Sequence, residues 1–237
     1  MKPLLSFPRL AGALCALVLF IGPPGLAALE KLTPPANGGK IKVAVVLHDG
    51  ATMIDFAGPW EVFQDVMWAG SDGNMVMPFE LYTVSDSTEM IHLSAGMAVV
   101  PSYTFKDAPE PAIVIIGAQG GKSPEMLDWL RQQAVRADVV MAVCLGVEKL
   151  ARAGLLDDKP ATTHPDFLDG FARRFPKVKF VKARGYVQSD PVIISTSGGV
   201  TSGIDAALHV VERYFGREIA QRTADYLEYG SDGWKQP

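Results

Sequence analysis

The chain has 237 residues, of which 48 % are hydrophobic and 20 % are charged, and its formal net charge is −4. This length and apolar content suit a single globular domain with a well-buried core. The acidic balance argues against partners that carry many phosphates. We therefore expect no nucleic-acid partner and no stable binding to an anionic membrane.

The first residues follow the order of a secretory signal peptide. Lys2 and Arg9 precede an apolar stretch over residues 10–21, and small residues follow near position 28. The stretch is shorter than the ~20 residues of a membrane span, and an uncleaved membrane anchor is the alternative. We expect a signal peptide over residues 1–28, a periplasmic or secreted protein, and no stable membrane association after cleavage. Cleavage leaves 20 Lys and Arg residues against 26 Asp and Glu residues.

The remaining chain alternates apolar runs with helical patterns. A linker is predicted over residues 29–40, a domain over residues 41–230 and a tail over residues 231–237. In chain order, the patterns predict a strand at 41–47, a helix at 57–69 beginning beside Gly58-Pro59, a strand at 79–84, a hairpin at 91–100, a strand at 112–116, a helix at 123–136, a strand at 139–143, helices at 145–154 and 167–175, strands at 178–181 and 192–196, and helices at 201–215 and 217–229. This alternation predicts an α/β fold with a doubly wound, mostly parallel sheet.

Cys144 stands where the apolar run 139–143 gives way to a helical pattern, with Gly146 two residues later. Such a turn is typical of a nucleophile elbow, which lifts one side chain off the sheet. The N–H groups at the helix start would lower the thiol pKa from about 8.5 towards neutrality. The alternative is a buried structural cysteine. Cys15 lies in the predicted signal peptide, so no internal disulfide is expected after cleavage.

Two loops are expected near Cys144, because ligands of such sheets sit beyond the carboxyl ends of the strands. Asp55, after the first strand, could exchange a proton with the thiol, or could simply cap the following helix. The glycine-rich loop that begins at Gly117 could offer backbone N–H groups that, with the N–H of Leu145, bind a developing oxyanion. A plain tight turn is the alternative for that loop.

His164 is the third candidate catalytic residue, because a Cys–His pair commonly activates a thiol. A loop histidine without a catalytic role is the alternative. The other histidines show no metal-ligand spacing, and we expect no metal and no cofactor.

Four motifs resemble the ThiJ/PfpI family of the class I glutamine amidotransferase-like superfamily. They lie at residues 55–63, 143–146, 153–164 and 197–205, and the similarity extends over about residues 41–229. The resemblance implies a flavodoxin-like three-layer sandwich that is usually a homodimer. It puts Cys144 in the place of the nucleophile, Asp55 in the place of the acidic partner, and His164 where some members keep a histidine. Gly58, Gly117, Ala118 and Leu145 are then expected to bind the substrate.

Members of this family include isonitrile hydratases and a domain of AraC-type regulators. The chain has Leu145 directly after the cysteine, where family hydratases usually carry Thr and family proteases carry His. Few residues follow the last predicted helix, so we expect no DNA-binding domain. The resemblance implies an exported cysteine-dependent enzyme that acts on a small electrophile, such as an isonitrile or an α-oxoaldehyde. The alternative is a non-catalytic ligand-binding or thiol redox-sensing domain.

Overall fold

The computed structural model describes residues 31–35, 38–70, 73–197, 199 and 201–235. The predicted signal peptide lies outside the described residues, as do Gly198 and Val200 of the last motif. None of the helices in the described part of the chain combines the length and hydropathy that crossing a membrane requires.

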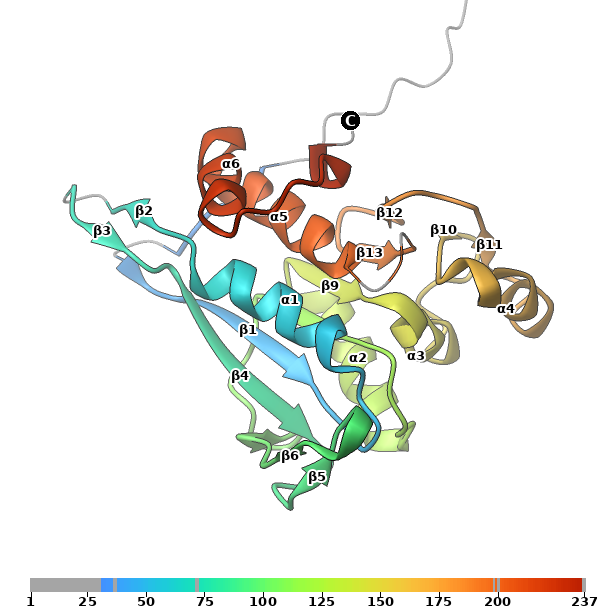
Figure 1. Ribbon diagram of the computed structural model, residues 1–237. Helices are drawn as coiled ribbons and strands as arrows, with labels where there is room; N and C mark the ends of the chain where they lie inside the picture. The colour runs from blue at the N-terminus through green and yellow to red at the C-terminus, as the bar shows by residue number, and fades with distance from the viewer. Residues whose placement is uncertain (1–30, 36–37, 71–72, 198, 200, 236–237) are drawn as a thin grey trace, which may run out of the picture.

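A seven-stranded sheet forms the centre of the molecule (Figure 1). Its strands, in spatial order, are β12 (Tyr186–Gln188), β13 (Ile193–Thr196), β9 (Val139–Ala142), β8 (Ile113–Ile116), β1 (Ile41–Val46), β4 (Phe79–Ser85) and β7 (Tyr103–Thr104). All neighbours are parallel except β12 and β13. The predicted doubly wound, mostly parallel sheet is therefore confirmed.

Successive residues of the central strands point into two separate cores, one on each face of the sheet. On β1, Val43 and Val45 enter one core, while Ala44 and Val46 enter the other. The first core is closed by α1 (Met53–Gln64), α5 (Ser202–Phe215) and α6 (Arg217–Tyr226), and the second by α2 (Pro124–Arg136), α3 (Val147–Arg152) and α4 (Leu168–Arg174). Burial on both faces explains why these strands read as continuous apolar runs.

The strand order also predicts where a ligand would bind. The long parallel strands, numbered along the chain, stand in the spatial order second, first, third, fourth, fifth, which is the flavodoxin-like arrangement. The order in which successive strands are added to the sheet reverses between β1 and β8. In such sheets ligands lie outside the carboxyl ends of the strands at this switch point. Asp55 lies in the first turn of α1, just after the loop that follows β1, and Gly117 directly follows β8.

The first helix begins earlier than predicted. It starts at Met53 rather than at residue 57, ends at Gln64, and has Pro59 in its interior. Pro59 has no N–H to donate to the carbonyl group of Asp55, which usually disfavours a helix. Packing overrides this local preference, because Pro59 is buried and a Cβ on Gly58 would lie 2.8 Å from Cγ1 of Ile204 on α5.

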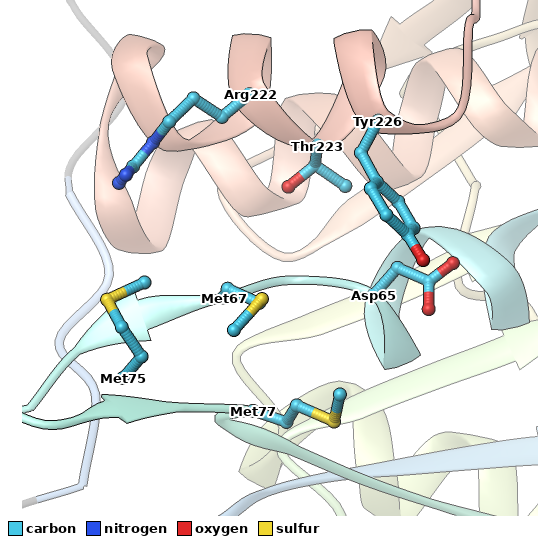
Figure 2. A pocket seen from close by; sticks show the side chains of 7 residues that line it. All are labelled: Asp65, Met67, Met75, Met77, Arg222, Thr223 and Tyr226. Carbon is cyan, nitrogen blue, oxygen red and sulfur yellow. The ribbon is translucent and has the colours of Figure 1, made fainter.

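Residues after α1 form a hairpin where the helix was predicted to continue. The strands β2 (Trp68–Ala69) and β3 (Met75–Val76) pair antiparallel, and the Trp68 ring packs on Phe215. Between this hairpin and α6 lies a hollow of about 260 Å³ (Figure 2). The predicted hairpin over 91–100 is present as β5 (Ile91–His92) and β6 (Ala98–Val99).

Three further differences concern the chain after residue 100. The strand predicted at 178–181 is β11 (Lys179–Phe180), which pairs with β10 (Pro160–Ala161) outside the central sheet. The edge strands β7 and β12 were not predicted, because two or three residues are too few to show a periodic pattern. Residues 231–235, expected in a tail, pack on α5: the Ser231 hydroxyl donates to Asp205, and Trp234 is fully buried.

The turn between β9 and α3 depends on a close approach of two backbone segments. A Cβ at Gly146 would lie far inside van der Waals contact with the carbonyl oxygen of Ile116, at the end of the neighbouring strand β8. Gly146 thus allows the chain to turn directly over the edge of the sheet, as the sequence predicted.

We expect Gly146→Ala to lower the free energy of unfolding by at least about 3 kcal/mol, because neither backbone segment can move away without disturbing its strand. Gly170→Ala is the matched control. Gly170 lies within α4 with open space around its Cα, so the substitution should stabilise the protein by up to about 1 kcal/mol. Urea unfolding followed by circular dichroism measures both changes. Equal stability of the two variants would contradict this packing.

Candidate active site

Cys144 occupies the elbow that the sequence predicts. The strand β9 ends at Ala142, and residues 144–146 form a single 3₁₀ turn before α3 begins at Val147. Cys144 has a φ of 55°, a conformation that non-glycine residues seldom adopt and that costs about 1–3 kcal/mol. Strain of this kind persists only where the surroundings hold the residue in place.

Two threonines hold the Cys144 backbone in this conformation. The N–H of Cys144 donates to Oγ1 of Thr196 at 3.0 Å, and the Thr163 hydroxyl donates to the Cys144 carbonyl oxygen at 3.1 Å. Thr196 ends the neighbouring strand β13, and Thr163 precedes His164 in the chain. Neither threonine was predicted as a site residue from the sequence. Their places, at a strand end and beside a candidate histidine, were the signals available.

Asp55 lies in the first turn of α1 with its side chain fully buried. Its Oδ2 accepts the N–H of Ala118 at 2.8 Å, whereas its Oδ1 is buried with no hydrogen-bond partner within the described residues. A Cβ at Gly117 would lie only 2.6 Å from Cβ of Asp55. The carboxyl group therefore does not cap α1 but crosses to the loop after β8, and the missing side chain of Gly117 makes room for it.

Burial raises the pKa of Asp55 to about 6, although the Ala118 N–H and the nearby His164 act in the opposite direction. Removal from water disfavours the charged form of a carboxyl group more than one N–H stabilises it. A carboxyl group with a pKa near 6 can both accept and release a proton close to neutral pH.

The expected low pKa of Cys144 is wrong. Burial, together with repulsion by the Asp55 carboxylate, raises the pKa of the thiol to about 11, and the N–H of Leu145 offsets this only in part. Cys144 is 8 % exposed and belongs to the core that α1 and α5 cover. At neutral pH Cys144 therefore carries its proton, and it sits in the wall of the core rather than in an open hollow.

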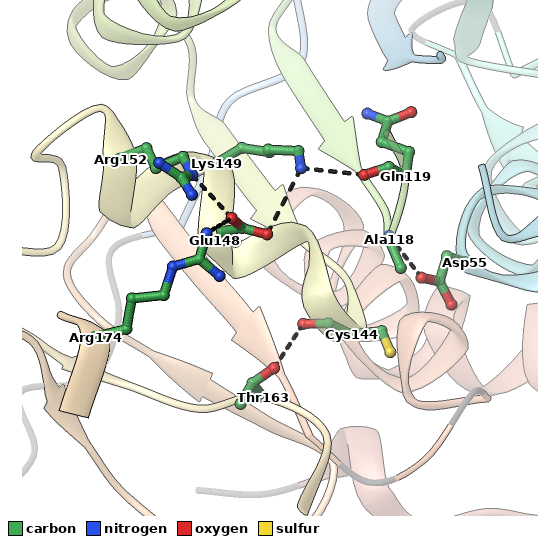
Figure 3. Close-up of polar contacts among 9 residues, drawn as sticks. All are labelled: Asp55, Ala118, Gln119, Cys144, Glu148, Lys149, Arg152, Thr163 and Arg174. Atoms are coloured by element: carbon green, nitrogen blue, oxygen red, sulfur yellow. Dashed lines mark hydrogen bonds and ion pairs between the residues drawn. The ribbon is translucent and has the colours of Figure 1, made fainter. Parts of the chain in front are cut away.

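The sulfur is nevertheless not isolated from polar groups. Figure 3 shows the Cys144 side chain on the same side of the turn as the Asp55 carboxyl group, in agreement with their electrostatic interaction. The charge of His164 acts in turn on Asp55. The fold thus places the Asp55 carboxyl group within electrostatic reach of both Cys144 and His164.

His164 is partly exposed and begins a 3₁₀ turn. Its Nδ1 accepts the N–H of Asp166 at 3.3 Å, and its ring packs edge-on against Phe167. Because Nδ1 is an acceptor, the neutral ring carries its proton on Nε2.

The residues expected to bind substrate fall into two groups. Gly117, Ala118 and Leu145 lie at the site, but the N–H of Ala118 is taken by Asp55 and the N–H of Leu145 by the Cys144 sulfur. Gly58 lies instead at the contact between α1 and α5, beside an apolar groove of about 280 Å³. Its close approach to Ile204 explains the glycine without a ligand.

A polar network fixes the loop that holds Asp55 (Figure 3). The ammonium group of the buried Lys149 donates to the Gln119 carbonyl oxygen at 3.1 Å and lies 3.8 Å from a carboxylate oxygen of Glu148. The Gln119 side chain accepts the N–H of His48 at 2.8 Å. A sequence pattern gives no sign of this network, because its members come from three separate loops and helices.

Among the described residues, no three His, Cys, Asp or Glu side chains lie where they could share a metal ion. The groups that the site offers are a thiol, a carboxyl group, an imidazole and backbone N–H groups. They suit nucleophilic and proton-transfer chemistry on a small molecule.

Known proteins similar to this chain are found by sequence and by structure. The chain is 28 % identical over 194 residues to an isonitrile hydratase of Pseudomonas putida, which covers 80 % of this chain and 78 % of that protein. It is also 28 % identical over 203 residues to the transcriptional regulator GbdR of Pseudomonas aeruginosa, covering 83 % of this chain but only 53 % of the regulator.

A crystal structure of a THiJ/PfpI family protein from Pseudomonas syringae superposes with a TM-score of 0.68 at 28 % identity, over 82 % of this chain and 77 % of that one. The family model described as DJ-1/PfpI matches residues 41–213. This range contains the strained elbow at Cys144 and the carboxyl group that faces it, and we conclude that the chain belongs to the DJ-1/PfpI family.

Proposed function

We propose that this protein is a cysteine-dependent enzyme that adds water to a small carbon electrophile, with an isonitrile as the favoured substrate. The observation that carries the proposal is the buried Asp55 carboxyl group, with a pKa near 6, beside a thiol that keeps its proton. The isonitrile hydratase of Pseudomonas putida is the relative whose name supports this substrate.

The pKa values of Asp55 and Cys144 assign the role of general base to Asp55 and that of nucleophile to Cys144. Above pH 6 the Asp55 carboxylate is ionised and can take the thiol proton while the sulfur attacks, so that no free thiolate is needed beforehand. A base of this strength is well matched to neutral pH. The N–H of Leu145 then stabilises the charge that develops on the sulfur.

The reaction on an isonitrile balances with one water molecule. The sulfur forms a bond to the terminal carbon, and that carbon receives the thiol proton through Asp55, which gives a thioimidate. Water then adds to the same carbon, the carbon–sulfur bond breaks, and the proton returns to the sulfur. The products are an N-substituted formamide and the free thiol.

We assign His164 to proton transfer in the second half of this sequence. Its Nε2 carries the proton of the neutral ring, because Nδ1 is occupied by the N–H of Asp166. The ring is also more exposed than Asp55, so it can exchange protons with bulk water.

The surroundings of the thiol favour a small, apolar substrate. Cys144 is only 8 % exposed, so a bulky molecule cannot reach the sulfur. Leu145 packs against the cores on both faces of the sheet and supplies an apolar wall with no hydroxyl group. The hydroxyl groups of Thr163 and Thr196 are both hydrogen-bonded to the backbone of Cys144.

The same observations argue against thiol redox sensing. Oxidation to sulfenic acid proceeds through an exposed thiolate, whereas this thiol is buried and its pKa is raised to about 11. A ligand-binding domain without catalysis would have no need of a buried carboxyl group that opposes folding at neutral pH.

We propose further that the protein is exported, acts as a homodimer, and has a small molecule but no nucleic acid as its partner. Export is supported by the charged, apolar and small-residue order of residues 1–28. The acidic net charge supports the absence of a nucleic-acid partner.

The enzyme hypothesis is tested with a panel of alkyl isonitriles and α-oxoaldehydes, with formamide or hydroxy acid detected by NMR. We expect turnover of an isonitrile, a loss of at least about 1,000-fold in Cys144→Ala, and kcat/KM that rises with pH through about 6 and then stays level. Asp128→Asn, which changes an exposed carboxyl group, is the control. Turnover that survives in Cys144→Ala would disprove the mechanism, and a rate that climbs steadily towards pH 11 would show a thiolate acting without Asp55.

Asp55→Asn should lower the pKa of Cys144, because it removes the repulsion between carboxylate and thiolate. Burial is the larger cause of the raised pKa, so the thiol of the variant should still titrate above the ordinary value of about 8.5. The rate of iodoacetamide alkylation between pH 7 and 11 measures the change. An unchanged alkylation profile would mean that the carboxyl group does not act on the sulfur.

The same substitution should stabilise the protein at pH 7. The folded-state pKa of Asp55 is raised, so as pH rises from about 4 to about 6 the unfolded chain releases its proton before the folded protein does, and stability falls. Above pH 6 the raised pKa lowers the free energy of unfolding by its full amount, about 2–3 kcal/mol, and the neutral Asn side chain avoids this loss. Urea unfolding should show the gain at pH 7 but not at pH 4, and no gain in Asp128→Asn. A less stable Asp55→Asn protein at pH 7 would be the opposite of this expectation.

A further inference from the structure

Three methionines gather on one face of the β2–β3 hairpin, away from the active site. The register pairs Ala69 with Met75 and Trp68 with Val76. Met67 directly precedes the first strand and Met77 directly follows the second, so the same register continued by one residue would oppose the two. Directly opposed residues of an antiparallel pair share a face, and so do residues two apart on one strand. Met67, Met75 and Met77 therefore form a triangle on a single face.

The spacing of this triangle suits one small ion. Opposed Cβ atoms of an antiparallel pair lie about 5 Å apart, and diagonal ones about 7–8 Å apart. A methionine side chain has three rotatable bonds beyond its Cα, so the three sulfur atoms can meet at one point. Ala69, the partner of Met75, has a small side chain and leaves this space free.

The same three side chains line the hollow of about 260 Å³ between the hairpin and α6. Figure 2 shows them along the two strands of the hairpin, across the hollow from α6, which contributes Thr223 and Tyr226 to the opposite wall. Each of the three is about half exposed, at 48–53 %. Side chains of this type are usually buried, so three exposed thioethers in one hollow need an explanation beyond packing.

We propose that Met67, Met75 and Met77 form a binding site for a soft monovalent metal ion of the Cu(I) or Ag(I) type. Thioether sulfur is a polarisable, uncharged donor that selects Cu(I) over hard cations such as Mg²⁺ and Ca²⁺. Unlike a thiol, a thioether binds metal without first losing a proton.

The charged groups of the hollow permit a monovalent ion. The Asp65 carboxylate supplies one negative charge, and the Arg222 guanidinium, at the other end beside Met75 in Figure 2, supplies one positive charge. These two charges offset each other, so the uncharged sulfur donors determine which metal ion is bound. A divalent cation would find too few oxygen ligands here.

The test is a titration of the purified protein with Ag(I), in a Cys144→Ala background so that the thiol cannot compete. The ¹³C-methyl signals of the methionines report each side chain separately. We expect the signals of Met67, Met75 and Met77 to shift together and saturate at one ion per chain. Met90 has an exposed fraction of 60 % and lies beside the other hairpin, and its signal should not move.

The affinity for Cu(I) is then measured by competition with a chromogenic chelator under anaerobic conditions. Met67→Leu and Met77→Leu should each raise Kd at least tenfold, while the matched control Met90→Leu leaves it unchanged. Leu conserves volume and apolar character, so the fold should persist, as circular dichroism can verify. The proposal is overturned if the three signals do not shift, or if replacing all three methionines leaves Kd unchanged.

Discussion

The contact between Asp55 and the loop after β8 is the constraint on which the site depends. It joins the first turn of α1 to the end of the neighbouring strand, through the hydrogen bond from Ala118 and the space left at Gly117. The contact is reinforced by the N–H of Thr52, which donates to the Ala118 carbonyl oxygen at 2.8 Å. Without this junction the carboxyl group would have no fixed position beside the elbow.

The position of Asp55 is costly, and this cost explains other features of the site. A fully buried carboxyl group with one unpartnered oxygen opposes folding once it is ionised. The strained backbone of Cys144 opposes folding as well. Both are held by the two cores that cover the sheet and by the hydrogen bonds of Thr163 and Thr196. Functional sites commonly draw on the stability of the surrounding fold in this way.

Much of the fold could be predicted from the sequence, because strands buried on both faces leave long apolar runs such as residues 41–47 and 112–116. The turn at Cys144 could be predicted as well. A single polar residue between an apolar run and a helical pattern, followed two residues later by Gly146, is typical of a nucleophile elbow. The start of α1 could not, because the packing of Gly58 and Pro59 on α5 overrides the local preference of proline.

The protonation state of Cys144 could not be predicted from the sequence, because it too depends on contacts between distant segments. The pattern indicates a helix start, which favours a thiolate, but burial and the charge of Asp55 act on the sulfur more strongly. Both depend on contacts between segments that are about ninety residues apart in the chain. The network around Lys149 and the thioether triangle on the β2–β3 hairpin likewise appear only once strands are paired and loops are placed.

The buried Trp234 has a consequence for the order in which the molecule can be completed during synthesis. Its ring fills the core beneath α5 and is flanked by the cationic groups of Arg217 and Lys235. A ribosome releases this residue after every strand of the sheet. The core covered by α1 and α5 therefore lacks this ring until Trp234 has been synthesised, whereas the residues of the opposite core all precede it in the chain.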